Sequence, residues 1–268
     1  MNRILVVGAP RSGTTWLAAT LAATPRAALM HEPDNPFFQP EASTSLALYG
    51  GYPVLHRRER APEYQRLWDD GFRQARARVL DPDAEPPWYA LRKRGLRPKA
   101  VIAKSVYAAF AMDWLVDRYS PRVVLIERHP IDVVCSWMRL GFVVGDLATR
   151  DRVRTEHVEP FRLPRWHESL PRLLQVSWAV GVLMSALRRQ ARARPDWTVI
   201  SYEALASDRS LLRSLALSLG LSWSDRAAAW AQTQDGAGVY TGSERVEARE
   251  YLLQFPELAP SLATPVAV

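Results

Sequence analysis

The sequence predicts an α/β fold, a parallel β-sheet with helices on both faces, and two observations lead to this prediction. Short apolar runs alternate with longer helical patterns along the chain, which is typical of βαβ units. The first run, 4–7, also meets a glycine-bounded turn at 8–13 and then an Ala/Leu-rich run that reaches Thr24. A strand, a glycine loop and a helix in this order indicate a P-loop (NTPase-like) fold.

The other elements are predicted from apolar runs and from the proline and glycine residues that bound them. Pro25 ends the first helix, 123–127 is the clearest buried strand, and Pro130 is well suited to begin the helix after it. No internal repeat interrupts this alternation. The expected strands are 4–7, 27–30, 100–103, 123–127 and 197–200, and the expected helices are 15–24, 63–79, 108–119, 131–140, 169–192, 208–219 and 224–233.

The length of 268 residues fits a single domain, 1–268, with a sizeable core. Residues 37–98 mix aromatic side chains with Arg and Pro and are expected to be a substrate-side insertion. These aromatics either line an acceptor pocket or pack as a cover on the sheet. Residues 141–168 are expected to be irregular, with Gly141 and Gly145, and are a candidate lid.

Composition limits the partners and the compartment. The net charge is +7, which suits a polyanionic ligand, but the arginines are scattered, so no nucleic-acid partner is expected. Cys135 is the only cysteine, which excludes an intrachain disulfide and favours a reducing compartment; we expect it to be buried. No apolar run approaches the roughly 20 residues of a membrane span. A cytoplasmic protein without stable membrane insertion is therefore expected.

The loop at 8–13 predicts an anion site. Its spacing nearly matches the G-x-x-x-x-G-K-[ST] phosphate loop, with Gly8 and Gly13 in place, but Thr14 stands where the lysine would be. Arg11 is the only cation inside the loop, and Ser12, Thr14 and Thr15 add hydroxyl groups. The loop can therefore bind an anion but lacks the side chain that handles a triphosphate.

Two segments carry a family resemblance. Residues 9–17, Ala-Pro-Arg-Ser-Gly-Thr-Thr-Trp-Leu, resemble the 5′-phosphosulfate loop of sulfotransferases that use 3′-phosphoadenosine-5′-phosphosulfate (PAPS). The strand at 123–127, then Arg128 and then Ser136, resembles the 3′-phosphate segment of that family. ATP has no 3′-phosphate, so this segment favours PAPS. The resemblance covers about 1–36 and 100–245.

The resemblance implies a complete nucleotide site. Trp16 would stack on the adenine, Tyr202 would approach it, and Arg245, in the segment 236–245, would close over the 3′-phosphate. The residues expected to bind PAPS are Arg11, Ser12, Gly13, Thr14, Thr15, Trp16, Arg128, Ser136, Tyr202 and Arg245.

The base is expected to be a glutamate. Cytosolic sulfotransferases carry a histidine shortly after a strand-end lysine, but here Lys104 is followed by Ser105-Val106, and valine cannot accept a proton. The tyrosylprotein and glycan branches use a glutamate about twenty residues after the loop arginine, where Glu32 stands. We expect Glu32 to be the general base, with His31 as the second candidate.

The remaining catalytic groups are cations. Arg11 would stabilise charge on the phosphate-side bridging oxygen, and Lys104 would bind the sulfuryl oxygens. No metal is expected, because PAPS has no β/γ-phosphate pair to bridge.

The predicted reaction transfers a sulfuryl group from PAPS to a hydroxyl of a small-molecule acceptor. The products would be a sulfate ester and 3′,5′-adenosine bisphosphate. The acceptor stays open among a natural product, a sugar or nucleoside, a glycolipid and a tyrosine. One alternative is a P-loop kinase or NTPase, which Thr14 disfavours; the other is a non-catalytic nucleotide-binding module.

Overall fold

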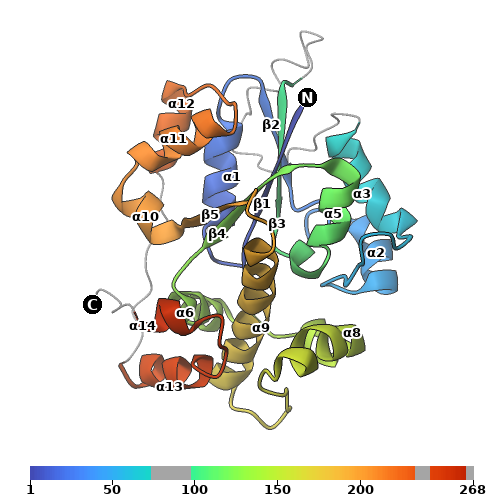
Figure 1. Cartoon of the computed structure of the whole chain (residues 1–268), viewed down its shortest axis with the longest axis vertical. Helices are drawn as coiled ribbons and strands as arrows, with labels where there is room; N and C mark the ends of the chain where they lie inside the picture. Colours follow the sequence, from blue (N-terminus) through green and yellow to red (C-terminus); the bar gives the residue numbers. More distant parts are fainter. Residues whose placement is uncertain (74–97, 233–241, 264–268) are drawn as a thin grey trace.

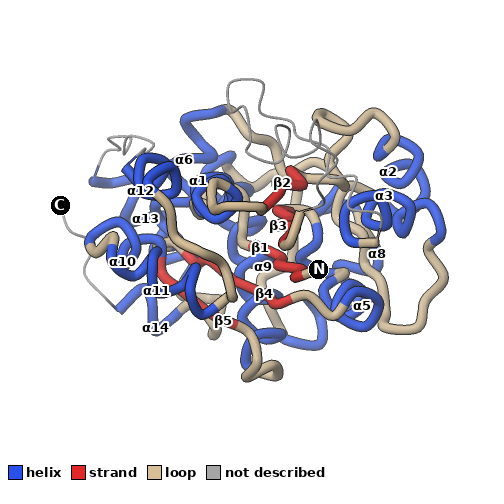
Figure 2. The backbone as a smooth tube through the Cα atoms, turned by 90° about the horizontal axis from the view of Figure 1, so that it is seen from above, coloured by secondary structure: helices blue, strands red, loops and turns tan. Residues whose placement is uncertain are grey.

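One parallel sheet organises the protein. The computed structural model describes residues 1–73, 98–232 and 242–263. Its strands lie side by side in the order β2-β3-β1-β4-β5, and every pair is parallel (Figures 1 and 2). The strands are β1 (Asn2–Val7), β2 (Ala27–His31), β3 (Ala100–Ser105), β4 (Arg122–Glu127) and β5 (Thr198–Ser201). All five predicted strands are confirmed, with ends that differ by one or two residues.

Helices cover both faces of the sheet, as predicted. Alternate residues of β1 enter different cores, with Ile4 and Val6 on one face and Leu5 and Val7 on the other. The first face packs against α1 (Thr14–Ala22), α10 (Tyr202–Ser207), α11 (Ser210–Ser218) and α12 (Asp225–Gln232). The second packs against α3 (Pro62–Phe72), α5 (Met112–Tyr119), α6 (Pro130–Leu140), α9 (Arg172–Arg192), α13 (Gly242–Leu252) and α14 (Ala259–Ala263).

The helix α6 shows how local sequence sets element ends. It begins at Pro130, as predicted, and Gly141 follows it with a φ of +70°, a conformation that glycine adopts without steric cost. Cys135 is buried within this helix, and burial raises the pKa of its thiol to about 11. The prediction of a buried cysteine is confirmed.

Several predicted elements need correction. The helix expected over 108–119 is a 3-10 turn, Ala108–Phe110, followed by α5, and the helix expected from 169 begins at Arg172, directly after Pro171. The helix expected over 63–79 ends at Phe72 in α3, and residues beyond 73 lie outside the described part.

The segment 141–168 is not irregular throughout. It contains α7 (Asp146–Thr149), α8 (Asp151–Val153), a π-helical turn (Arg154–Val158) and a 3-10 turn (Glu159–Phe161). Val153, Val158 and Leu163 from this stretch are buried in the core beside α9. Burial of these side chains accounts for the helical turns, which the charged sequence around them conceals.

The first part of the predicted insertion is packed on the core. It forms α2 (Ala42–Tyr49), which the sequence pattern did not predict, and α3. Tyr64, Trp68 and Phe72 of α3 are buried against Trp114 and Tyr119 of α5. These aromatics therefore belong to the core, whereas Trp88 and Tyr89 lie outside the described residues.

Within the described ranges, none of the helices has the length and apolar character needed to cross a membrane.

Candidate active site

A cavity of about 840 Å³ lies where the strands end. Its wall includes residues that follow each strand, which agrees with the rule that open α/β sheets bind ligands outside the carboxyl ends of their strands. Described residues on the wall include Arg11, Gly13, Thr14, Thr15, Trp16, His31, Glu32, Asn35, Lys104, Arg128, Trp137 and Tyr202.

The loop between β1 and α1 can hold an anion. The first bond of the helical type runs from the Leu17 N–H to the Gly13 carbonyl, at 3.0 Å, so the amides just before Leu17 have no acceptor within the helix. Gly13 has a φ of +90°, and a Cβ there would lie 2.4 Å from the Tyr202 ring. Glycine thus lets Tyr202 approach the loop, whose amides and positive helix end favour an anion.

Arg11 joins the two segments that were predicted to bind one nucleotide. Its Nε donates to the Ser136 Oγ at 3.1 Å, and an Nη of Arg128 donates to the Arg11 carbonyl at 3.3 Å. Ser136 is buried and is not among the residues that line the cavity. The anion loop and the segment from Arg128 to Ser136 therefore meet, with the guanidinium groups of Arg11 and Arg128 on the cavity wall.

Two aromatic rings form the wall beside the loop. Trp16 and Tyr202 meet edge to face with centroids 5.7 Å apart, and the Arg128 guanidinium lies 4.8 Å from the centre of the Tyr202 ring. Arg209 lies over Trp16 at 4.9 Å. A flat, electron-rich ring could pack against this wall.

Besides Ser136, two further predicted nucleotide ligands lie apart from the cavity wall. Arg245 is on α13, where its guanidinium bonds to Asp132 of α6 at 2.9 Å. Ser12 is fully buried beneath the loop, and its Oγ has no partner within the described residues. Neither residue lines the cavity, and residues 236–241 of the predicted closing segment lie outside the described part.

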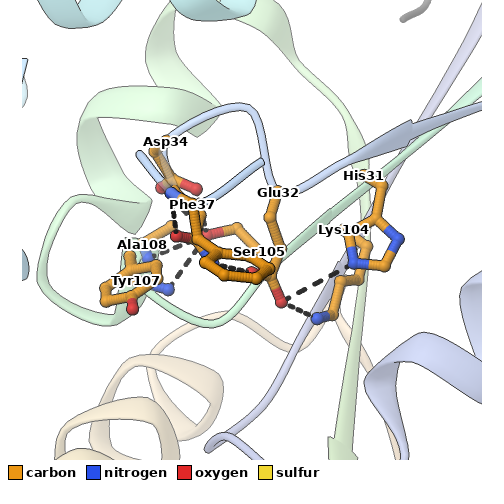
Figure 3. Close-up of polar contacts among 9 residues, drawn as sticks. His31, Glu32, Asp34, Phe37, Lys104, Ser105, Tyr107 and Ala108 are labelled. Atoms are coloured by element: carbon orange, nitrogen blue, oxygen red, sulfur yellow. Dashed lines mark hydrogen bonds and ion pairs between the residues drawn. The ribbon is translucent and has the colours of Figure 1, made fainter. Parts of the chain in front are cut away.

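A buried carboxylate faces the same cavity. Glu32 is 5% exposed, and its φ of +43° is unusual for a residue with a side chain. The Lys104 Nζ donates to its Oε1 and the Asn35 Nδ2 donates to its Oε2. His31 Nε2 lies 3.9 Å from Oε1, and Figure 3 draws the His31 and Lys104 side chains on the same side of the Glu32 carboxylate. The carboxylate is thus held from three sides in a strained turn, an arrangement found often at functional sites.

Lys104 lies between the carboxylate and the loop. It is 3% exposed, and burial together with the positive charge of Arg11 lowers the pKa of its ammonium to about 7. Since Lys104 and Arg11 both line the cavity, an anion bound between them would relieve the repulsion between these two cations.

A second buried acid supports the turn from behind. The Tyr64 hydroxyl and the Ser105 hydroxyl each donate to the Asp34 carboxyl group at 2.9 Å. The Ser105 Oγ also accepts from the Tyr107 and Ala108 amides, at 3.1 and 3.0 Å (Figure 3). Burial raises the pKa of Asp34 to about 6. This network ties the turn after β2 to the end of β3.

Sequence reasoning missed Asp34 and Asn35. The available signal was the segment Glu32-Pro33-Asp34-Asn35-Pro36, in which two prolines enclose polar residues directly after a strand. Such a rigid turn presents its side chains in fixed directions.

The parallel sheet, the glycine loop and the cavity at the strand ends define an α/β protein of the P-loop class. Within that class, the model of the sulfotransferase family matches residues 3–225. The chain belongs to this family, which confirms the resemblance found in the loop and the Arg128 segment.

Solved structures show the same fold. The sulfotransferase domain of the Synechococcus PCC 7002 olefin synthase is 16% identical, with a TM-score of 0.52 over 99% of this chain and 96% of that one. Sulfotransferase STF9 from Mycobacterium avium is 14% identical, with a TM-score of 0.52 over 100% and 77%. The sulfotransferase domain of the curacin biosynthetic pathway is 13% identical, with a TM-score of 0.50 over 99% of each chain. A search of curated proteins found no match.

Proposed function

We propose that this enzyme transfers the sulfuryl group of PAPS to a hydroxyl group of a small-molecule acceptor, with Glu32 as the general base. The observation that carries the proposal is the buried Glu32 carboxylate, held by Lys104 and Asn35, in the cavity that also contains the anion loop. Membership of the sulfotransferase family supports the reaction type. The single cysteine, which is buried, suits reaction in the reducing cytoplasm.

The residues around the loop fit PAPS chemically. Arg11, Thr14 and Thr15, with the amides at the start of α1, would bind the 5′-phosphosulfate. Arg128 would bind the 3′-phosphate, and Ser136 would reach it if the bond from Arg11 were released. The aromatic wall of Trp16 and Tyr202 would hold the adenine.

Bound PAPS would supply an activated sulfur–oxygen bond. Glu32 would accept the proton of the acceptor hydroxyl while the acceptor oxygen bonds to sulfur. A carboxylate oxygen can accept two hydrogen bonds, so Glu32 can take this proton while it still accepts from Lys104 and Asn35. Arg11 would stabilise the charge that develops on the bridging oxygen as the old bond breaks, and Lys104 would bind the sulfuryl oxygens.

The first test compares nucleotides and then acceptors. Thermal unfolding is measured with 3′,5′-adenosine bisphosphate, ADP and ATP, each with EDTA or Mg²⁺. At a hundredfold excess over its Kd, a ligand stabilises the folded state by about 2.7 kcal/mol. We expect this shift with the bisphosphate, with or without Mg²⁺, and a sulfate ester when PAPS and hydroxyl acceptors are incubated with the enzyme. Stabilisation only by ATP with Mg²⁺ would instead indicate a kinase or NTPase.

A further inference from the structure

Beyond Glu32, the wall of the cavity is formed mainly by apolar and aromatic side chains. Next to Lys104, the wall is formed by Val106, which is 8% exposed, and by Tyr52 and Tyr107, whose ring centroids are 5.0 Å apart. His31 is covered on this side by the Phe38 ring at 4.7 Å. A hydroxyl group placed at Glu32 would therefore be attached to a part of the acceptor that lies in an apolar slot.

The apolar wall continues to the outside of the protein. Phe37 is 86% exposed, Val143 is 79% exposed and Phe142 is 40% exposed, and all three line the cavity. We call these three residues the apolar rim. They come from two segments, the turn after β2 and the stretch after α6. Large apolar side chains that gather in solvent around one opening indicate a binding surface.

Each aromatic residue of the rim rests on an aromatic residue inside. Phe37 packs edge to face on Phe38 at 5.0 Å, and Phe142 packs edge to face on Trp137 at 5.5 Å. The Trp137 Nε1 in turn donates to the Pro10 carbonyl of the anion loop at 2.8 Å. A continuous apolar path therefore leads from the reacting groups to the surface.

The charged groups stay at the inner end. Among the described residues that line the cavity, the acidic and basic ones are Arg11, His31, Glu32, Lys104 and Arg128, and none belongs to the apolar rim. Tyr52 and Tyr107, which also line the cavity, each carry one hydroxyl group. The side-chain amide of Asn35 is already engaged, because its Nδ2 donates to Glu32 and its Oδ1 accepts from the Phe37 N–H at 3.0 Å. A charged or sugar-like acceptor would find few polar partners along this path.

We infer that the acceptor is an uncharged alcohol on an extended apolar chain, with its hydroxyl at Glu32, its chain in the slot and its far end across the apolar rim. The inference rests on the proposed sulfuryl transfer and narrows its acceptor class. It selects a lipid-like alcohol over sugars, nucleosides and acidic peptides.

A homologous series tests the chain length. The enzyme is assayed with PAPS and primary alcohols from butanol to decanol, and with glycol monomethyl ethers of equal length as polar controls. Complete burial of one methylene changes binding about fourfold, so we expect kcat/KM to rise up to fourfold per methylene and to level off once the chain passes the rim. The glycol ethers should stay near butanol.

Rim variants test the path itself. Phe37→Ser and Val143→Ser should each reduce kcat/KM by a factor that grows with chain length, reaching about tenfold for decanol. The matched control is Leu48→Ser, which changes an apolar side chain that is 58% exposed but does not line the cavity. It should leave the dependence on chain length unchanged.

Two results would overturn the inference, and they are distinct from failure of the proposed function. One is a kcat/KM that does not rise with chain length while sugars or charged alcohols are sulfated. The other is that decanol does not raise the unfolding temperature of the bisphosphate-bound enzyme and does not act as an acceptor. If no acceptor of any class gives a sulfate ester and the bisphosphate does not bind, sulfuryl transfer itself fails.

Discussion

The two ends of the cavity are built in opposite ways. At the nucleotide end, polar side chains bond to one another across the fold, as in the contacts of Arg11 with Ser136 and of Arg128 with the Arg11 carbonyl. At the acceptor end, apolar side chains from two segments stand partly in solvent, with Phe37 and Val143 the most exposed. The contrast supports the proposal that the polar end binds the sulfuryl donor and that the apolar end binds the acceptor.

The strongest test of this division is removal of the proposed base. Glu32→Gln should lower kcat about 10²- to 10⁴-fold, because the amide cannot accept the proton. The affinity for 3′,5′-adenosine bisphosphate should stay near the wild-type value, since Glu32 belongs to the other end. Single-turnover rates and titration calorimetry measure the two effects.

Glu168→Gln serves as the matched control for this substitution, because Glu168 is exposed. Thermal unfolding of Glu32→Gln also reports whether the loss of its ion pair with Lys104 destabilises the fold. A wild-type turnover rate in Glu32→Gln would contradict the proposed role of Glu32 and would make His31 the candidate base.

The stability of the turn that carries Glu32 should depend on pH through Asp34. Burial raises the pKa of Asp34 from 3.8 to about 6, so the folded state holds this proton more tightly than the unfolded chain. This contribution to stability is fully present only well below pH 3.8 and is lost as the pH rises through about 6. At 1.36 kcal/mol per pKa unit, the free energy of unfolding should fall by about 3 kcal/mol in total from this group alone, about 2 kcal/mol of it between pH 4 and 6.

Asp34→Asn removes the titration while it keeps a neutral side chain of similar size. Urea unfolding between pH 4 and 7 should therefore show a flatter dependence in this variant than in the wild type. The control is Asp196→Asn, at an exposed position after α9. Equal slopes in Asp34→Asn and the wild type would refute this assignment.

A smaller effect is expected at the nucleotide end. Arg128→Ala should weaken 3′,5′-adenosine bisphosphate binding about 10- to 100-fold, because a charge-assisted bond is worth about 1.5–3 kcal/mol. Binding of 5′-AMP, which has no 3′-phosphate, should change little. Arg165→Ala, at an exposed arginine, is the control. An equal loss for both nucleotides would mean that Arg128 acts through its bond to the Arg11 carbonyl.

The smallest predicted effect concerns the orientation of the base. Asn35→Ala removes a hydrogen bond to the Glu32 carboxylate, and a typical hydrogen bond contributes about 0.5–1.5 kcal/mol. We therefore expect kcat to fall by about two- to tenfold. Asn35→Asp replaces the donating amide with a second carboxylate and should lower kcat at least as much. An unchanged kcat in both variants would show that Asn35 does not position the base.

The elements encoded by local pattern could be predicted from the sequence. The strands, the anion loop and the position of Arg128 depend on apolar runs and glycine spacing within a few residues. The family resemblance indicated Glu32 and Lys104, and the structure has them in contact at the carboxyl ends of neighbouring strands.

Features that depend on distant partners could not be predicted. Tyr52 lines the cavity while Tyr64, Trp68 and Phe72 are in the core, although all four lie in the same aromatic-rich stretch of the sequence. Their separation depends on α5, whose Trp114 and Tyr119 receive the aromatic face of α3. The helical turns of 141–168 likewise depend on packing against α9.

The order of strands in the sheet fixes the distance between Glu32 and the anion loop. Glu32 follows β2, Lys104 is the last residue but one of β3, and the anion loop follows β1. These three strands are neighbours in that order, with His31 and Val6 both in register with Lys104. Neighbouring strands are about 4.8 Å apart, so two steps of backbone separate base and loop by about 10 Å. Phe37 and Val143 do not belong to these strands. Under the proposal above, substitution of these two residues should therefore change which alcohol is accepted, while the distance between Glu32 and the anion loop stays constant.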